Sequence, residues 1–290
     1  MKFGRAYAAK VQGKYFNHLI QSPLTCRFHV TRNSLFSCGP ASFQFYNLTQ
    51  DVRHDIYRDA YQFSEYKQVV FSAGYEKEPA RPIIYQGNVY QAYSYRQGPD
   101  WITELDCRDG GNAVERSSIS LTKPSPWNFE DAIKQIVGSM LPYNVNLGVI
   151  GNFQNSNTRG VTFSGNSWDI LTQRLMPLHA EAFIDQERVN VIQQYEYIEL
   201  VGGLDEISAN TGLIGTPKLQ EQVVVATMVF EPRLQVAQLV ELKTQESRMN
   251  GPYKILSIAH SGTISGAVCE NLETTVTLFQ PDRELIGVSR

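Results

Sequence analysis

The chain has 290 residues, of which 42% are hydrophobic and 19% charged, and its formal net charge is -3. This composition excludes a disordered chain, and the length allows two or three compact domains. The 26 basic residues are scattered, which argues against a protein that grips nucleic acid. No apolar run could cross a bilayer and no signal peptide is visible, so we expect a soluble protein folded in the cytoplasm.

The N-terminal third alternates between apolar and polar residues, as half-buried strands do. Its many Tyr and Phe residues lie in these alternating segments, which favours sheet over helix. Leu48, Val52 and Ile56 recur at helical spacing around Thr49, a residue type that caps helices, and they predict one short helix. The pattern as a whole predicts a β-barrel or sandwich over residues 1–111.

The clearest pattern lies between Tyr85 and Gly111 and is typical of a β-hairpin with a Gly-Pro-Asp turn. Val89, Tyr93 and Tyr95 are predicted to share one side of its first strand. The second strand is predicted to have an apolar and a charged face, formed respectively by Trp101, Leu105 and Cys107 and by Glu104, Asp106 and Arg108.

Residues 112–126 are polar and rich in turn formers, so we expect a linker there. Two helices follow, with Asn128 and Ser167 as their expected caps. A strand lies between the helices and a tight hairpin turning at 185–187 follows them, which predicts a small α+β domain over residues 127–200. The apolar faces of the two helices are formed by Phe129, Ile133, Ile136 and Met140 and by Trp168, Leu171 and Leu175.

The last part of the chain, residues 201–290, is predicted to be a second barrel. Gly and Pro residues within 211–219 favour a connector rather than a strand. The two barrels would flank the α+β domain in a mainly β chain, and their weak similarity is compatible with an old duplication. Four strand patterns follow the connector, at 221–230, 238–244, 253–262 and 273–281.

Three neighbouring acids, Glu104, Asp106 and Asp109, could in principle serve acid–base chemistry or bind calcium. Glu104 and Asp106 lie on the outward face of a predicted strand, and Asp109 opens a Gly-Gly turn. A solvated surface is therefore the better interpretation. We expect no catalytic residues and no cofactor-binding residues in this chain.

Cys26, His29 and Cys38 could contribute to a metal site, but no second histidine stands at ligand spacing and a fourth ligand is missing. We therefore expect no metal. The cysteines, which also include Cys107 and Cys269, show no paired spacing and are interpreted as reduced core or edge residues.

Three further patterns are better explained by structure than by chemistry. His260 and Ser261 are neighbours on a predicted strand and would point to opposite faces, so we expect a satisfied histidine beside a turn. The glycines at 202–203 lack the lysine of a phosphate loop. Asn166 and its neighbours fit a helix cap rather than a nucleophile elbow. The aromatic residues could stack on sugars or bases, but more often they fill cores and subunit interfaces.

Several motifs occur in a characteristic order: ASFQFYNLT, VVFSAGY, IIYQGNVYQAYSYRQGPDWITELDCRDGG, SWDILTQRLMPLHAEAFIDQERVNVI and NGPYKILSIAHSG. Together they resemble bacteriophage baseplate hub proteins, a family related to the spike base of type VI secretion systems and to late control protein D. The resemblance covers most of the chain beyond its first two dozen residues. It implies two tube-type barrels in each subunit.

The resemblance also implies a non-enzymatic virion protein of the tail baseplate, made in the host cytoplasm. Three copies would form a ring with six barrels, which joins a hexameric tail tube to a trimeric central spike. Other baseplate proteins would bind it, genomic DNA would only pass through, and the chain would not insert into a membrane. A channel wall without strong positive charge would suit that passage.

Two other functions compete with the hub. A distal tail or tube-initiator protein would form a ring of six copies instead of three. A tail-associated cell-wall hydrolase would be an enzyme, and the isolated chain would then cleave cell walls.

Overall fold

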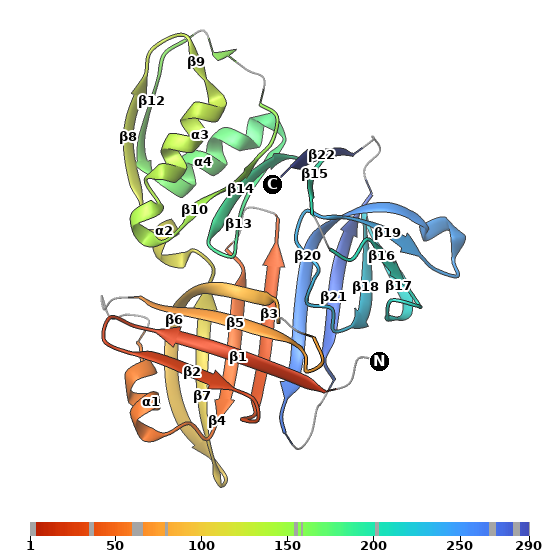
Figure 1. Cartoon of the computed structure of the whole chain (residues 1–290). Helices are drawn as coiled ribbons and strands as arrows, with labels where there is room; N and C mark the ends of the chain where they lie inside the picture. The colour runs from red at the N-terminus through yellow and green to blue at the C-terminus, as the bar shows by residue number, and fades with distance from the viewer. Residues whose placement is uncertain are drawn as a thin grey trace.

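The computed structural model of the chain is mainly β with a smaller helical part, which confirms the predicted fold class. It describes residues 4–34, 38–59, 66–78, 81–153, 156–157, 159–200, 203–266, 271–280 and 285–289. Figure 1 shows an N-terminal half, a C-terminal half beside it, and a helical part above the N-terminal half. None of the helices in the described ranges has the length and apolar character that crossing a membrane requires.

Seven strands of the N-terminal half curl around an aromatic core. The rings of Phe43 and Phe71 lie 4.7 Å apart between centroids and are fully buried, so much of the aromatic excess fills this core. Helix α1 (Gln50–Ile56) buries Ile56 as predicted, and Thr49 stands at its N-cap without a side-chain hydrogen bond. The strands are β1 (Arg5–Gln12), β2 (Asn17–Gln21), β3 (Cys26–Asn33), β4 (Pro40–Tyr46), β5 (Lys67–Tyr75), β6 (Ile83–Gln97) and β7 (Asp100–Arg108).

The predicted hairpin is formed by β6 and β7, but its first strand contains a bulge between Val89 and Gln91. A bulge adds one residue and therefore moves the following side chains to the other face. Val89 is buried as expected, and Ala92 takes the next inward position. Tyr93 and Tyr95 face outward, so the prediction that they share a side with Val89 is wrong.

The second strand of the hairpin follows the prediction except at its start. Leu105 and Cys107 are buried, and Glu104, Asp106 and Arg108 point outward. Trp101 is 38% exposed and lies under the guanidinium of Arg53, 3.9 Å from the ring centroid. The indole is covered by a cation–π contact with α1 rather than by the core.

The helical lobe packs two helices on a three-stranded sheet. Asn128 caps the first helix as predicted, whereas Asn166 and not Ser167 accepts the capping hydrogen bonds of the second. The predicted linker 112–126 contains a helix and a strand, because its Ser, Ile, Leu and Thr residues alternate as in an exposed hairpin. The elements are α2 (Gly111–Arg116), β8 (Ser118–Lys123), β9 (Trp127–Asn128), α3 (Phe129–Gly138), η1 (Leu141–Tyr143), β10 (Asn146–Ile150), β11 (Ser156–Asn157), β12 (Val161–Asn166), α4 (Ser167–Leu175), η2 (Met176–Leu178), β13 (Ala180–Asp185) and β14 (Arg188–Gln193).

The C-terminal half contains the four predicted strands and several shorter ones. The expected connector at 211–219 is instead strand β17, so that prediction is wrong. A bulge between Ile214 and Lys218, with Gly215 at φ +69°, accommodates the Gly and Pro residues at the sheet edge. The elements are β15 (Glu196–Glu199), β16 (Glu206–Ser208), β17 (Leu213–Gln220), β18 (Val223–Val229), β19 (Leu239–Lys243), η3 (Ser247–Met249), β20 (Gly251–Ile264), β21 (Glu273–Phe279) and β22 (Ile286–Ser289).

The two halves are joined through one sheet. Two separate barrels would each require a sheet that closes on itself within one half. The described strands instead form one open path in the order β17-β18-β21-β20-β3-β4-β7-β6-β5-β1-β2. Strands β20 and β3 pair over eight residues and thereby satisfy two edges that would otherwise be exposed. Separate hydrophobic cores still lie in the two halves. The domain boundaries drawn from the sequence stay predictions.

Candidate assembly surfaces

One face of the long sheet points away from both cores and carries many polar side chains. On β3, β4, β18 and β21, buried residues alternate with more exposed ones without interruption. Such alternation is expected of a sheet with one dry and one wet side. We call the following residues the outer sheet face: Arg27, His29, Thr31, Ser42, Gln44, Gln91, Tyr93, Glu104, Asp106, Arg108, Val225, Thr227, Val229, Ala259, Ser261, Glu273, Thr275 and Thr277.

Cross-strand pairing arranges these side chains in rows that cross from one half of the chain to the other. Asp106 pairs with Ser42, and Ser42 pairs with His29. His29 then pairs with Ser261 across the β3–β20 junction, and Ser261 pairs with Glu273. The outer sheet face is therefore a single surface and not two separate ones.

Charges on the outer sheet face are few and of both signs. Arg27 and Arg108 are its basic residues, and Glu104, Asp106 and Glu273 are its acidic ones. Burial, with Glu104 nearby, raises the pKa of Asp106, and the neighbouring Arg108 opposes that shift. The face carries no excess of positive charge, so it offers little attraction to a phosphate backbone.

Two open hollows on the outer sheet face meet at His29. One of about 320 Å³ is lined partly by Asp106, and the other, of about 460 Å³, partly by Ser261. Cys26 points into the core from the same strand, so the structure does not bring it together with His29. Among the described residues, no three His, Cys, Asp or Glu side chains are grouped as metal ligands.

The described cysteines are all free thiols. Burial raises the pKa of Cys26 and of Cys107 well above the usual value. Burial also raises the pKa of Cys38 to about 12. These thiols are inert core or near-core groups, as expected from their spacing, and Cys269 lies outside the described residues.

Asp109 is buried, so its interpretation as a solvated turn residue is wrong. Its side chain accepts hydrogen bonds from the backbone N–H groups of Gln186 and Glu187 at 2.7 and 2.9 Å. These two residues form the turn between β13 and β14, with φ values of 54° and 57°. Burial and the nearby Asp185 raise the pKa of Asp109, whereas the two N–H donors oppose this.

Strands β13 and β14, which we call the junction hairpin, extend from the helical lobe toward both halves of the long sheet. The Nε and Nη2 atoms of Arg32 on β3 each lie 2.6 Å from a carboxylate oxygen of Asp185. The Nζ atom of Lys254 on β20 lies 3.2 Å from Glu181. Burial lowers the pKa of Lys254 and raises that of Glu181, and their mutual attraction opposes both shifts.

His260 is fully buried inside β20, not beside a turn as expected. Its Nδ1 lies 2.9 Å from Oγ1 of Thr274. Burial, reinforced by Arg32, lowers the pKa of His260 to about 3. Ser261 belongs to the opposite face, which confirms that the two neighbours do not form a base and nucleophile pair.

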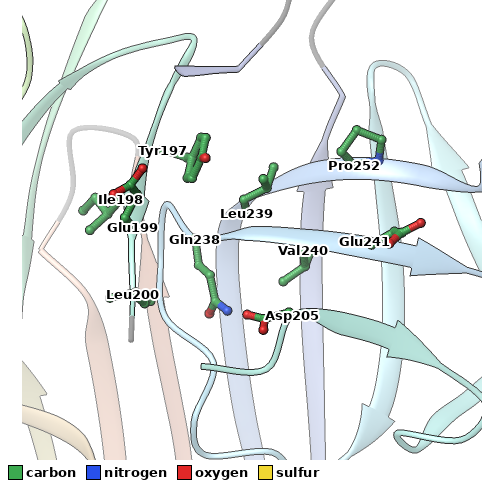
Figure 2. Close-up of a pocket in the computed structure, with 10 residues that line it drawn as sticks. All are labelled: Tyr197, Ile198, Glu199, Leu200, Asp205, Gln238, Leu239, Val240, Glu241 and Pro252. Atoms are coloured by element: carbon green, nitrogen blue, oxygen red, sulfur yellow. The ribbon is translucent and has the colours of Figure 1, made fainter. Parts of the chain in front are cut away.

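A groove of about 560 Å³ opens where β15 and β19 diverge, as Figure 2 shows. Next to the groove, the N–H of Ile198 donates to the carbonyl of Ala237, two residues before β19 begins, at 2.8 Å. Ile198 and Val240 are buried at its base. The side-chain amide of Gln238 donates to the carbonyl of Leu204 at 2.7 Å, which fixes one wall.

A family model described as "Baseplate hub gp41" matches residues 8–261. The chain belongs to this family. Membership confirms the resemblance drawn from the sequence motifs and gives the chain a structural role in a phage tail baseplate. A comparison with curated protein sequences finds no match.

Solved structures of phage tail proteins share the fold of this hub family member. The prophage MuSo2 43 kDa tail protein from Shewanella oneidensis is 9% identical with a TM-score of 0.64, and 96% of this chain and 98% of that chain are covered. A tail protein from Neisseria meningitidis MC58 is 11% identical with a TM-score of 0.58, covering 96% and 97%. The E. coli c3393 protein, a type VI secretion component similar to T4 gp27 and gp5, is 11% identical with a TM-score of 0.61, covering 96% and 78%.

The candidate surfaces of this hub family member were only partly visible in its sequence. Alternation indicated the outward residues of β3 and β7, but it did not show that the two halves share one face. Arg32 carried a usable signal, because it stands at an inward position after Phe28 and Val30. An inward charge in such a strand requires a buried partner. No sequence pattern indicated the groove between β15 and β19.

Proposed function

We propose that this chain is a non-enzymatic baseplate hub subunit that assembles as a ring of three. The ring would join the hexameric tail tube to the central spike and let DNA pass through its centre. One observation carries the proposal: strands β17 to β6 form an unbroken run of eight antiparallel strands across two cores. Two curled halves per chain supply six similar units in three copies.

The size of the outer sheet face supports a channel. Strands are spaced about 4.8 Å apart, so eight of them span roughly 40 Å. Three such spans would enclose a circle roughly 35–40 Å across at the backbone. The outer sheet face would line this channel.

The chemistry of the same face supports passage rather than binding. Its Ser, Thr and Gln side chains stay hydrated, and its charges are few and of mixed sign. Phosphate binding depends on clustered Lys and Arg residues, which release counterions when DNA binds. A wall of this kind would let DNA slide past without holding it.

The placement of ionisable groups favours a structural role over an enzymatic one. Asp185 and Glu181 are committed to buried ion pairs in the junction hairpin. His260 is fully buried and kept neutral. Catalysis requires such groups to reach a substrate, and these do not. The subunit would be made in the host cytoplasm and then built into the virion.

The decisive measurement is the mass of the assembled protein. Light scattering coupled to size exclusion should give three times the 32.8 kDa chain mass for the chain alone, and three copies of the chain in a complex with tube and spike proteins. Six copies would favour a distal tail or tube-initiator protein. A stable monomer that cleaves purified cell walls would overturn the proposal in favour of a hydrolase.

A further inference from the structure

We propose that the groove between β15 and β19 docks an extended segment of a partner protein that carries basic side chains beside apolar ones. This goes beyond the ring, because it concerns a peptide-binding site within one subunit. It holds whether the chain assembles in three copies or in another number. The groove in Figure 2 supports it through its shape, its apolar base and its charge.

The shape of the groove suits a chain in extended conformation. Strand β15 pairs in parallel with β22 on one side. On its other side, the N–H of Ile198 donates to the carbonyl of Ala237, just before β19 begins, and the two strands then diverge. Beyond the N–H of Ile198, none of the described strands pairs with that edge of β15, whose strand partner is β22. An added strand could bond to this edge, as in other cases of β-strand addition.

The base and walls of the groove are apolar. Ile198 and Val240 lie at its base, and Leu239, Leu200 and Pro252 form part of its walls. An apolar side chain of the incoming segment would remove this surface from water. Burial of such surface favours binding of even a short segment.

The rim of the groove is acidic and selects the charge of the occupant. Glu199, Asp205 and Glu241 are exposed around it, and its lining contains no Lys or Arg. Lys243 lies just beyond, where its Nζ is 2.7 Å from Glu206 and 3.7 Å from Glu241. One lysine does not balance four carboxylates. A basic segment would therefore be attracted and an acidic one repelled.

The test uses the full chain and a fluorescent hexapeptide of alternating leucine and lysine, with binding followed by fluorescence anisotropy. The variant E199Q/D205N/E241Q should weaken binding about tenfold, since exposed charge pairs contribute modestly. A matched control, D51N/E76Q/E221Q, removes the same charge from exposed positions elsewhere in the chain and should bind as the wild type does. Added salt should weaken wild-type binding.

The location of the peptide is tested with a photo-crosslinking group at its centre. Labelling of residues 197–200 or 238–241 would support the groove, and labelling elsewhere would overturn it. Equal binding by the triple variant, or by a leucine–glutamate peptide, would also overturn the proposal. So would a change in the oligomeric state of the triple variant, since a second copy of the chain would then be the occupant.

Discussion

The outer sheet face and the junction hairpin consist of similar strands, but their polar groups lie in different surroundings. On the outer sheet face, Ser and Thr side chains stay in contact with water and depend little on any partner. In the junction hairpin, Asp185 and Glu181 are buried opposite Arg32 and Lys254. A buried charge is costly unless it is paired. Sensitivity to mutation should therefore be concentrated in the few contacts of the hairpin.

The largest expected effect is the loss of one member of the Arg32–Asp185 pair. The variant Asp185→Leu should lower the free energy of unfolding by about 3–5 kcal/mol, because it leaves a buried guanidinium unpaired. Urea denaturation measures this change. The double variant Arg32→Met/Asp185→Leu should recover most of the loss. If the single and double variants are equally unstable, the pairing is not what matters.

Removal of the Asp109 carboxylate should have the next largest effect. Asp109→Ala leaves the N–H groups of Gln186 and Glu187 without their acceptors and should cost about 2–3 kcal/mol. Hydrogen exchange of these two amides should also become faster. The matched change Asp106→Ala, on the outer sheet face, should cost less than about 0.5 kcal/mol. If both variants lost the same free energy of unfolding, the junction hairpin would not be more sensitive to mutation than the outer sheet face.

His260 gives the comparison a dependence on pH. The pKa of His260 is lowered from its ordinary value of 6.5 to about 3 in the folded protein. The folded state therefore binds this proton less readily than the unfolded state does. The stability that depends on a neutral His260 is fully present above pH 6.5 and is lost as the pH falls toward 3. Between pH 6.5 and pH 5, the free energy of unfolding should decrease by about 2 kcal/mol on this account. Denaturation of His260→Gln over the same range should lack this component of the slope.

The smallest effect should come from the outer sheet face itself. Thr275→Ala and Ser261→Ala should each change the free energy of unfolding by no more than about 0.5 kcal/mol, because both side chains are on the hydrated face. Thermal denaturation of the two variants checks this. A larger loss in the isolated chain would mean that the face is already covered, for instance by another copy.

The parts of the fold that follow a local period were predictable. Alternation located most strands, and helical spacing with Asn128 located α3. The bulge after Val89 was not predictable, because a single inserted residue leaves no compositional trace. The strand at 213–220 was hidden by its Gly and Pro residues, which an edge bulge tolerates.

The candidate surfaces were less predictable than the strands, because they depend on contacts between distant segments. Arg32 and Asp185 are separated by 153 residues, and no local sequence pattern indicates that they form a pair. The groove likewise forms between β15 and β19, whose separation depends on how the C-terminal half folds. Charge and hydropathy describe single segments, so pairings of this kind require the tertiary structure.

Strand β20 is a member of both halves. Its Ile258 packs in the C-terminal core and its Ile264 in the N-terminal core, while its backbone pairs with β3. Neither half should therefore unfold and leave the other intact, because unfolding of one core removes β20 as a packing partner of the other core. On heating, these two β regions should give a single cooperative transition. A fragment that ends before Gly251 should therefore fail to fold on its own.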